Sequence, residues 1–200
     1  MDKVYDHKKI EEKIYKQWED SGSFSPEVNP NGKPFTIILP PPNANAPLHF
    51  GHAMYVVEDI LIRYHRMLGD ASLWLSGADH AGFETQFVFE KQLQKDGKSR
   101  FDYDRDTLYK MIWDFVEKNR PVMENQLKRL GFSLDWTRKK LTIDEDIIPI
   151  VYKTFKKMFD EGLIYRGERL VNYCTKDGTS FSDYETSHVE KVDHLYYMKY

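Results

Sequence analysis

The chain has 200 residues, enough for one ordinary domain or for one domain and the start of another. Acidic residues outnumber basic ones by 32 to 29, so the formal net charge of −3 excludes a polycation that binds nucleic acid by charge alone. A hydrophobic share of 40% and an aromatic share of 14% exclude a disordered chain. The single cysteine, Cys174, excludes an internal disulfide and an all-cysteine metal site.

The N-terminal segment is charged and lacks the apolar run of a secretory signal peptide. No stretch approaches the roughly 18 apolar residues that a membrane span needs. We therefore expect a soluble, cytoplasmic protein. Small basic clusters such as Arg138-Lys139-Lys140 remain candidate contacts for nucleic acid.

The first half of the chain alternates between two hydrophobic periods. Apolar residues at helical spacing predict a helix over 6–20, and an apolar run bounded by prolines predicts a short buried strand over 35–39. Apolar residues then recur at threes and fours from 51 to 68, which predicts a second helix. A strand over 71–76 and a helix to about residue 94 follow.

This order of strand, loop, helix, strand, loop and helix predicts the fold class. It indicates an α/β protein with a Rossmann-like parallel sheet, right-handed crossovers and flanking helices. Ligands of such sheets bind beyond the carboxyl ends of the strands. The loops that follow the two strands should therefore share one edge, and both contain unusual residues.

The second half is predicted to be mostly helical. Amphipathic helices are expected over 104–130, with an interruption at Pro121, and over 144–160. The segment 163–172 fits a pair of short strands, and the alternating residues 194–200 predict a final strand.

The first loop of interest contains His49-Phe50-Gly51-His52 at the start of a predicted helix. The unpaired N–H groups of a helix N-terminus suit a phosphate, and two histidines one turn apart add donors toward the same anion. Gly51 lacks a side chain, so a flat base or a phosphate can approach the backbone. The structural alternative is a pair of surface histidines that cap the helix.

The second loop contains Asp79 in the segment GADHAG, between a strand and a helix. A carboxylate at this position can pair with a substrate cation, and Gly77 and Gly82 let the loop fold tightly around it. The structural alternative is an aspartate that serves as an N-cap.

A zinc site and a covalent nucleophile are the alternatives to these interpretations. His49, His52 and His80 could bind zinc, but no carboxylate or cysteine lies at the usual ligand spacing beside the pair, so we expect no metal site. The chain has no G-x-S-x-G segment, and Cys174 has no histidine near it in sequence.

Several sequence blocks resemble, in order, those of the class I aminoacyl-tRNA synthetases. PPPNANAPLHFGHA is similar to their HIGH-signature region, and GADHAGFETQ is similar to the second signature of the valine-specific members of the isoleucine, leucine and valine subgroup. The further blocks are LIRYHRMLGD, RLGFSLDWTR, EGLIYRGERLVNYC and TSFSDYE. Phe50 replaces a smaller aliphatic residue of the signature, and no KMSKS-like segment occurs.

The resemblance implies ATP-dependent activation of valine to valyl-adenylate and transfer of valine to tRNA(Val). His49 and His52 would be the catalytic residues and, with Gly51, would bind ATP: the histidines would donate hydrogen bonds to phosphate oxygens, and Gly51 would face adenine or ribose. Mg²⁺ would accompany the ATP phosphates, and no tightly bound cofactor is implied. The expected partners are valine, ATP and tRNA(Val), with no membrane, and the protein is expected to be a monomer.

The resemblance also implies an amino-acid site. Asp79 would hold the ammonium group of the substrate, aided by Asn43 and by the carbonyl of Pro41. Pro41 and Pro42 would form one wall of the pocket for the side chain.

The resemblance further suggests a division of the chain. Residues 1–34 would form an N-terminal helix and lead-in loop, residues 35–186 the first half of a nucleotide-binding catalytic domain with a helical insertion, and residues 187–200 the entry strand of an editing domain. The chain would be the N-terminal part of a catalytic domain, and we expect it to charge little or no tRNA by itself.

Three alternatives stay open at the level of the sequence. One is a module that binds ATP or an amino acid without aminoacylation, which the lack of a KMSKS-like segment favours. Another is an isoleucine-specific member of the same class. A third is a different nucleotidyltransferase with an H-x-G-H segment, although such proteins lack the DHAG and SDYE blocks.

Overall fold

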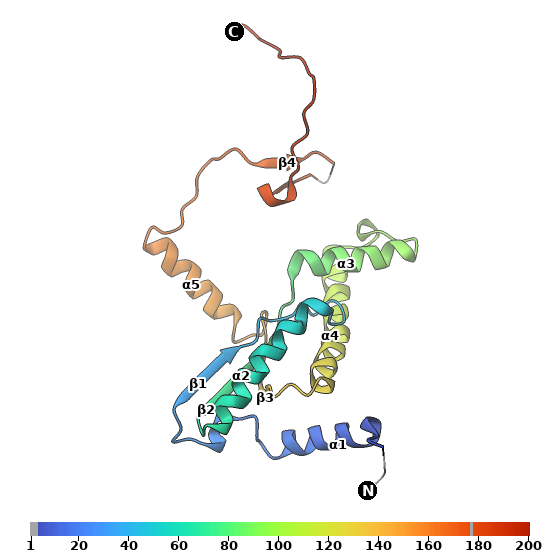
Figure 1. The fold of residues 1–200 in the computed structure, drawn as a ribbon. Coiled ribbons are helices and arrows are strands. Elements are labelled where there is room, and N and C mark those ends of the chain that lie inside the picture. Colours follow the sequence, from blue (N-terminus) through green and yellow to red (C-terminus); the bar gives the residue numbers. More distant parts are fainter. Residues whose placement is uncertain (1–3, 177) are drawn as a thin grey trace. The chain divides into compact units, whose positions relative to one another are not determined.

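The computed structural model describes residues 4–176 and 178–200, and the chain divides into two compact units, Met1–Lys153 and Thr154–Tyr200. The first unit is built on a three-stranded parallel sheet in the order β1-β2-β3. Its strands are β1 (Pro34–Ile38), β2 (Ala71–Ala78) and β3 (Asp135–Leu141) (Figure 1). The predicted α/β fold with a parallel sheet is therefore confirmed.

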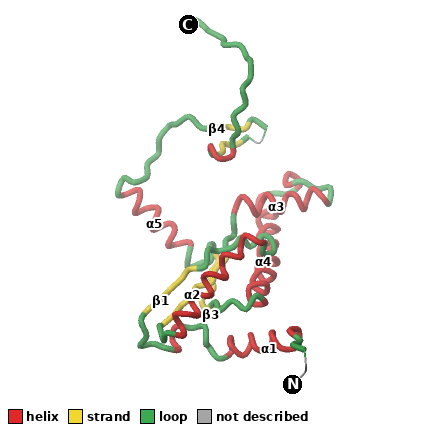
Figure 2. Tube along the Cα trace, viewed as in Figure 1, coloured by secondary structure: helices red, strands yellow, loops and turns green. Residues whose placement is uncertain are grey.

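Helices connect and flank these strands, so that helix and strand alternate along the first unit (Figure 2). A 3₁₀ turn, η2, precedes α2 directly, and α5 runs across the boundary between the two units. The elements are α1 (His7–Asp20), η1 (Pro26–Val28), η2 (Phe50–Met54), α2 (Tyr55–Met67), α3 (Gly82–Lys95), η3 (Arg100–Asp102), α4 (Arg105–Arg129) and α5 (Ile148–Asp160).

The core of the first unit lies on the face of the sheet against which α2 packs (Figure 1). Alternate residues of β2 are buried, as the period of a strand requires, and Trp74 on that strand is 0% exposed. A sheet and a helix each bury one face, so the contacts between α2 and the sheet fix which face of the sheet is turned toward the core. The main cluster contains Leu39, Tyr55, Ile62, Trp74, Leu127, Phe132 and Leu134.

The third strand, β3, has no counterpart among the predicted elements. Its sequence, DWTRKKL, is rich in charge, and only its end residues Asp135 and Leu141 are fully buried. In the described sheet it is an edge strand that pairs only with β2, with a shift of register between Leu75 and Gly77. An edge strand can keep charged residues along its length, which is why the hydrophobic pattern did not reveal it.

Two helices of the structure differ in detail from the predicted ones. α4 continues through Pro121 without a break, because Val116, Met123 and Leu127 are buried on one side and hold both halves of the helix in place. α5 begins only at Ile148, because the preceding residues form turns. In these turns the backbone carbonyl of Asp144 accepts hydrogen bonds from the N–H groups of residues 147 and 148.

The second unit contains an antiparallel pair, β4 (Asn172–Cys174) and β5 (Thr179–Phe181), followed by the turn η4 (Asp183–Glu185). The pair of strands predicted within 163–172 is thus wrong in position. The chain reverses nearer Gly178, whose φ of 67° favours glycine, and not at Gly167. The strand predicted over 194–200 is also wrong, because this segment pairs with no other described strand.

No helix within the described ranges is long and apolar enough to cross a membrane. The divisions expected at 34/35 and 186/187 concern a larger catalytic domain and stay predictions. What the fold fixes is the sheet edge at which the carboxyl ends of β1, β2 and β3 meet.

Candidate functional site

The loops after β1 and β2 run side by side beyond the ends of their strands. The N–H of Asp79 donates to the carbonyl of Pro42 at 2.9 Å, and the N–H of Ala44 donates to the carbonyl of Asp79 at 2.8 Å. Asn43 and Asp79 therefore form a parallel β-bridge. The structure thus brings together three of the predicted amino-acid-binding residues, Pro42, Asn43 and Asp79.

The loop after β1 is anchored at both of its ends. The Tyr55 hydroxyl donates to the carbonyl of Pro40 at 2.7 Å, and the N–H of Leu48 donates to the Gln126 Oε1 atom at 2.7 Å. Burial raises the pKa of Tyr55 to about 12, so its hydroxyl stays a donor at neutral pH. Between these anchors Ala44 is fully buried. The loop is consequently held in one conformation by α2, α4 and β2.

Asp79 also contacts the segment that follows β3. Its Oδ1 atom accepts a hydrogen bond from the Thr142 hydroxyl at 2.9 Å and another from the N–H of Ala81 at 3.1 Å. The Asp79 side chain is 37% exposed, and no described residue donates a hydrogen bond to its Oδ2 atom. The turn-capping alternative therefore accounts for Oδ1, whereas Oδ2 has no hydrogen-bond partner among the described residues.

The turn between β2 and α3 is made by Ala81 and not by the glycines beside it. Ala81 has φ 50° and ψ 39°, a left-handed conformation that is uncommon for a residue with a side chain. Gly77 is needed for a different reason, since a Cβ atom there would lie 3.3 Å from the carbonyl oxygen of Lys140. Strained backbone of this kind concentrates at functional sites.

His49 and His52 cap the turn at the start of η2. The His49 Nδ1 atom accepts from the N–H of Gly51 at 3.0 Å, and the His52 Nδ1 atom accepts from the N–H of His49 at 3.0 Å. The ring centroids of the two histidines are 4.2 Å apart. Because the His49 Nδ1 atom is an acceptor, a neutral His49 ring carries its proton on Nε2. The His52 Nδ1 atom also lies 3.1 Å from the carbonyl oxygen of His49, so its role as donor or acceptor depends on the tautomer of the ring.

This geometry favours the imidazoles over two of the backbone amides as candidate phosphate donors. The N–H groups of His49 and Gly51 are already paired with imidazole nitrogens, so these two amides are not free for an anion. Gly51 is also explained differently, because a Cβ atom there would lie 2.7 Å from the His49 Cε1 atom. Gly51 therefore makes room for the His49 ring. The imidazoles of His49 and His52 are then the candidate donors of this loop.

The two groups of predicted residues leave the same edge of the sheet, but no described contact joins His49 or His52 to Asp79. A cavity of about 160 Å³ opens at this edge, and of the predicted site residues only Pro41 lines it. The cavity is lined by Ile38, Leu39, Pro41, Leu75, Ser76, Gly77, Ala78, Lys140, Leu141, Thr142 and Ile147. That the histidines and Asp79 serve one cleft stays a prediction.

The basic cluster on β3 is neutralised within the chain. Arg138 pairs with Asp135 and Glu27, Lys139 with Glu124 at 3.0 Å, and Lys140 with Asp146 at 2.6 Å. These pairs weaken the expectation that the cluster binds nucleic acid. Among the described residues, no group of three or more histidine, cysteine, aspartate or glutamate side chains is arranged to hold a metal ion.

Sequence reasoning did not assign a role to Thr142 or to His80 in binding a substrate. The N–H of Thr142 donates to the carbonyl of Ala78 at 3.2 Å, which continues β3 past its last residue and places the hydroxyl beside Asp79. The sequence pattern did not indicate Thr142, because it did not reveal β3. A third strand at the carboxyl edge would have indicated Thr142 as the next residue to examine.

The chain matches the family of class I tRNA synthetases (I, L, M and V) over residues 13–199. It therefore belongs to this family, whose members use ATP. The fold agrees, because a solved ternary complex of Agrobacterium radiobacter K84 agnB2 LeuRS, tRNA and LeuAMS superposes with a TM-score of 0.71 and 22% sequence identity. That match covers 88% of this chain and 20% of the LeuRS chain.

Within the family, the similar sequences are valine--tRNA ligases. The chloroplastic/mitochondrial valine--tRNA ligase 2 of Arabidopsis thaliana is 47% identical over 191 residues, which cover 95% of this chain and 20% of the relative. The valine--tRNA ligase of Dehalococcoides mccartyi is 42% identical over 201 residues, covering 100% of this chain and 23% of the relative. The chain spans about a fifth of the length of these relatives. Family membership does not fix the compartment, since the Arabidopsis relative is organellar.

Proposed function

We propose that this chain supplies the site at which a valine--tRNA ligase binds ATP and valine and forms valyl-adenylate. The observation that carries the proposal is the contact of three segments at one sheet edge: the Asn43–Asp79 bridge and the Thr142 hydrogen bond leave one oxygen of Asp79 open. A carboxylate held in this way is suited to bind a cation at a fixed position.

The amino acid would bind at the loop after β1. Asp79 Oδ2 would accept a hydrogen bond from the ammonium group of valine, and Asn43, held beside Asp79 by the bridge, would add a second polar contact. A hydrogen bond to a charged group contributes about 1.5–3 kcal/mol. Pro41 is exposed and lines the cavity, which supports a role for Pro41 beside the isopropyl group. Pro42 is buried and does not line the cavity, so it would act only by supporting Pro41.

ATP would bind at the histidine turn. The Nε2–H groups of His49 and His52 would donate to phosphate oxygens, and Gly51 would let the His49 ring lie flat over the backbone. Magnesium would arrive with the ATP phosphates as part of the substrate. Donors that are oriented before the reaction stabilise the charge that develops in the transition state, and each typically contributes about 2.7–4 kcal/mol.

The reaction would then require positioning more than covalent chemistry by the protein. A carboxylate oxygen of valine attacks the α-phosphorus of ATP, the bond to the bridging oxygen breaks, and pyrophosphate leaves with the electron pair. The valyl group would next be transferred to tRNA(Val). The pocket would exclude isoleucine by size, whereas threonine, an isostere with a hydroxyl, would be rejected only about a hundredfold, as is known for valine-specific enzymes of this class.

A second candidate function is a module that binds ATP and valine without charging tRNA. The pairing of all three residues in Arg138–Lys140 with carboxylates favours it, because this cluster then offers little charge to a tRNA. A direct binding assay for tRNA(Val) with the purified protein separates the two candidates. Binding that weakens with salt supports the ligase, and its absence supports the module.

The experiment that tests the proposal uses non-hydrolysable aminoacyl-sulfamoyl-adenosines as probes. We expect the valyl compound to bind to the purified protein and to outcompete the isoleucyl compound by at least about tenfold. ATP and valine should each displace it. A protein that binds neither compound, or that binds both equally, would contradict the proposed function.

A further inference from the structure

The hydrogen bonds around Thr142 determine where its single hydroxyl proton lies. The Thr142 Oγ1 atom is 2.9 Å from Asp79 Oδ1, 3.1 Å from the His80 backbone nitrogen and 2.5 Å from His80 Nδ1. A carboxylate can only accept and a backbone N–H can only donate. The hydroxyl proton therefore points to Asp79, and one oxygen lone pair takes the N–H of His80.

The remaining lone pair of the Thr142 oxygen fixes the His80 ring. With one lone pair and the proton already used, Oγ1 can only accept from His80 Nδ1, so this nitrogen carries the ring proton. The same Nδ1 atom lies 3.4 Å from Asp79 Oδ1. Thr142 thus directs its proton to one oxygen of Asp79, and His80 directs its ring proton to Thr142.

We propose that Thr142 is a positioning residue for the amino-acid site. Its hydroxyl holds Oδ1 of Asp79 inward, so that Oδ2 is presented to the ammonium group of the substrate, and it fixes the Nδ1–H form of His80. This inference rests on the proposed function. It adds the residue that follows β3 to a site that the sequence analysis assigned to the first two loops alone.

Two neighbouring hydrogen bonds also hold the backbones of His80 and Thr142. The Thr85 hydroxyl donates to the carbonyl of His80 at 2.6 Å, and the backbone of Thr142 is tied to Ala78. The backbones of His80 and Thr142 therefore each keep one hydrogen bond that does not involve the Thr142 hydroxyl, although the N–H of His80 also donates to it. Replacing Thr142 by valine removes the hydroxyl and keeps the shape, so the change isolates the orientation of Asp79.

The test compares two ligands that differ only in the ammonium group, valyl-sulfamoyl-adenosine and its 3-methylbutanoyl counterpart. We expect Thr142→Val to weaken the valyl compound by about tenfold, which is the range of a hydrogen bond to a charged group. The counterpart should bind within about twofold of the unaltered protein. Thr142→Ser, which keeps a hydroxyl, should restore the affinity for the valyl compound.

A matched control comes from the other end of the same strand. The Thr137 hydroxyl donates to Asp135 Oδ1 at 2.6 Å, so Thr137→Val removes an equivalent threonine–aspartate hydrogen bond far from the proposed site. This variant should leave the affinities for both compounds unchanged. Nitrogen-15 NMR of the His80 ring adds a second readout: the unaltered protein should show the proton on Nδ1, and Thr142→Val should shift it toward Nε2.

The outcomes separate the inference from the proposed function. If Asp79→Asn weakens only the valyl compound while Thr142→Val weakens both compounds equally or neither, Thr142 has no positioning role and the proposed function stands. If the unaltered protein and Asp79→Asn bind the two compounds alike, the proposed ammonium site is itself wrong. A folded Thr142→Ser variant that behaves like Thr142→Val would also overturn the inference.

Discussion

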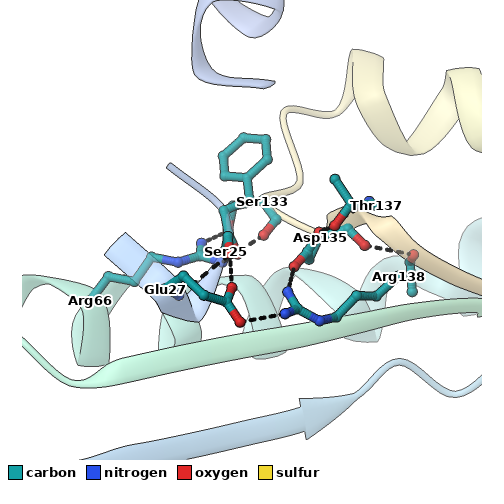
Figure 3. A network of polar contacts seen from close by, with 9 residues as sticks. Ser25, Glu27, Arg66, Ser133, Asp135, Thr137 and Arg138 are labelled. Carbon is teal, nitrogen blue, oxygen red and sulfur yellow. Dashed lines mark hydrogen bonds and ion pairs between the residues drawn. The ribbon is translucent and has the colours of Figure 1, made fainter. Parts of the chain in front are cut away.

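The two ends of the sheet each contain an aspartate that accepts from a threonine hydroxyl, and the two aspartates are used differently. At the amino end of β3, Asp135 is 2% exposed and pairs with the N–H and hydroxyl of Thr137 and with Arg138 (Figure 3). At the carboxyl edge, Asp79 is 37% exposed and uses only Oδ1 within the described residues. A saturated carboxylate stabilises the fold, whereas a half-saturated one can bind a ligand.

The surroundings reinforce this difference. At the amino end the Arg66 guanidinium donates to the hydroxyl and carbonyl of Ser133, and Arg138 bridges Asp135 to Glu27 (Figure 3). Burial lowers the pKa of Arg66 to about 10, so it stays charged at neutral pH. At the carboxyl edge, by contrast, the Asp79 carboxylate has no arginine or lysine partner among the described residues. The proposed ammonium site lies at that edge.

The largest effect should come from removing Asp135, the carboxylate whose oxygens are both paired within the chain. We expect Asp135→Ala to lower the free energy of unfolding by about 3 kcal/mol, because it leaves Arg138 and the Thr137 N–H without their buried partner. Chemical denaturation measures this directly. A loss no larger than that of an average surface substitution would show that the amino-end network is not structural.

The matched change at the open end should affect binding instead of folding. Asp79→Asn should weaken valyl-sulfamoyl-adenosine by about thirtyfold, since an ammonium loses its charged acceptor, and should leave ATP affinity nearly unchanged. The free energy of unfolding should change by less than about 1 kcal/mol. Titration calorimetry and denaturation together test both parts, and an equal loss for both ligands would refute the role of Asp79.

A smaller effect is expected at the histidine turn. In Gly51→Ala the new methyl group would collide with the His49 ring, so the ring must leave its capping position. Loss of one cap costs about 1 kcal/mol, and we expect ATP to bind about fivefold more weakly while valine binding is retained. Ala53→Gly, in the same exposed turn but away from the ring, is the control. Unchanged ATP affinity in Gly51→Ala would exclude His49 as a phosphate donor in this position.

The smallest effect concerns pH. Hydrogen bonds from Ser25 and Arg138 lower the pKa of Glu27 to about 2 from an ordinary value of 4.5. The ionised group therefore favours the folded state above pH 4.5, and this contribution is lost as the pH falls from 4.5 toward 2. Glu27→Gln should flatten the decline of stability in that interval. An identical pH profile in the variant would show that Glu27 does not contribute.

The sequence predicted the parallel sheet and the role proposed for Asp79, but it did not predict β3, which carries Asp135. The order of strands, loops and helices in the first half predicted a parallel sheet, and the resemblance directed attention to His49 and Asp79. The strand β3 was missed because its charges hide its pairing with β2. Without β3, neither Asp135 nor Thr142 had a predicted place, and the two aspartates could not be compared.

The site itself shows a similar limit. Sequence spacing indicated that His49, Gly51 and His52 act together, but not that the imidazoles occupy the amides of their own turn. That outcome depends on the rotation of each ring, which spacing does not specify. Likewise, the segment GADHAG indicated a tight turn, but the left-handed residue is Ala81 and not a glycine, because α3 and β2 fix the backbone there.

The most direct test of the account is a crystal structure of the protein with valyl-sulfamoyl-adenosine bound. We predict the ammonium group within hydrogen-bonding distance of Asp79 Oδ2, Thr142 still bonded to Oδ1, and the sulfamoyl group at the Nε2 atoms of His49 and His52. Binding at the opposite end of the sheet, in the cavity of about 150 Å³ lined by Glu19, Phe24 and Trp136, would contradict the account. So would an ammonium group at the carboxyl edge that makes no contact with Asp79.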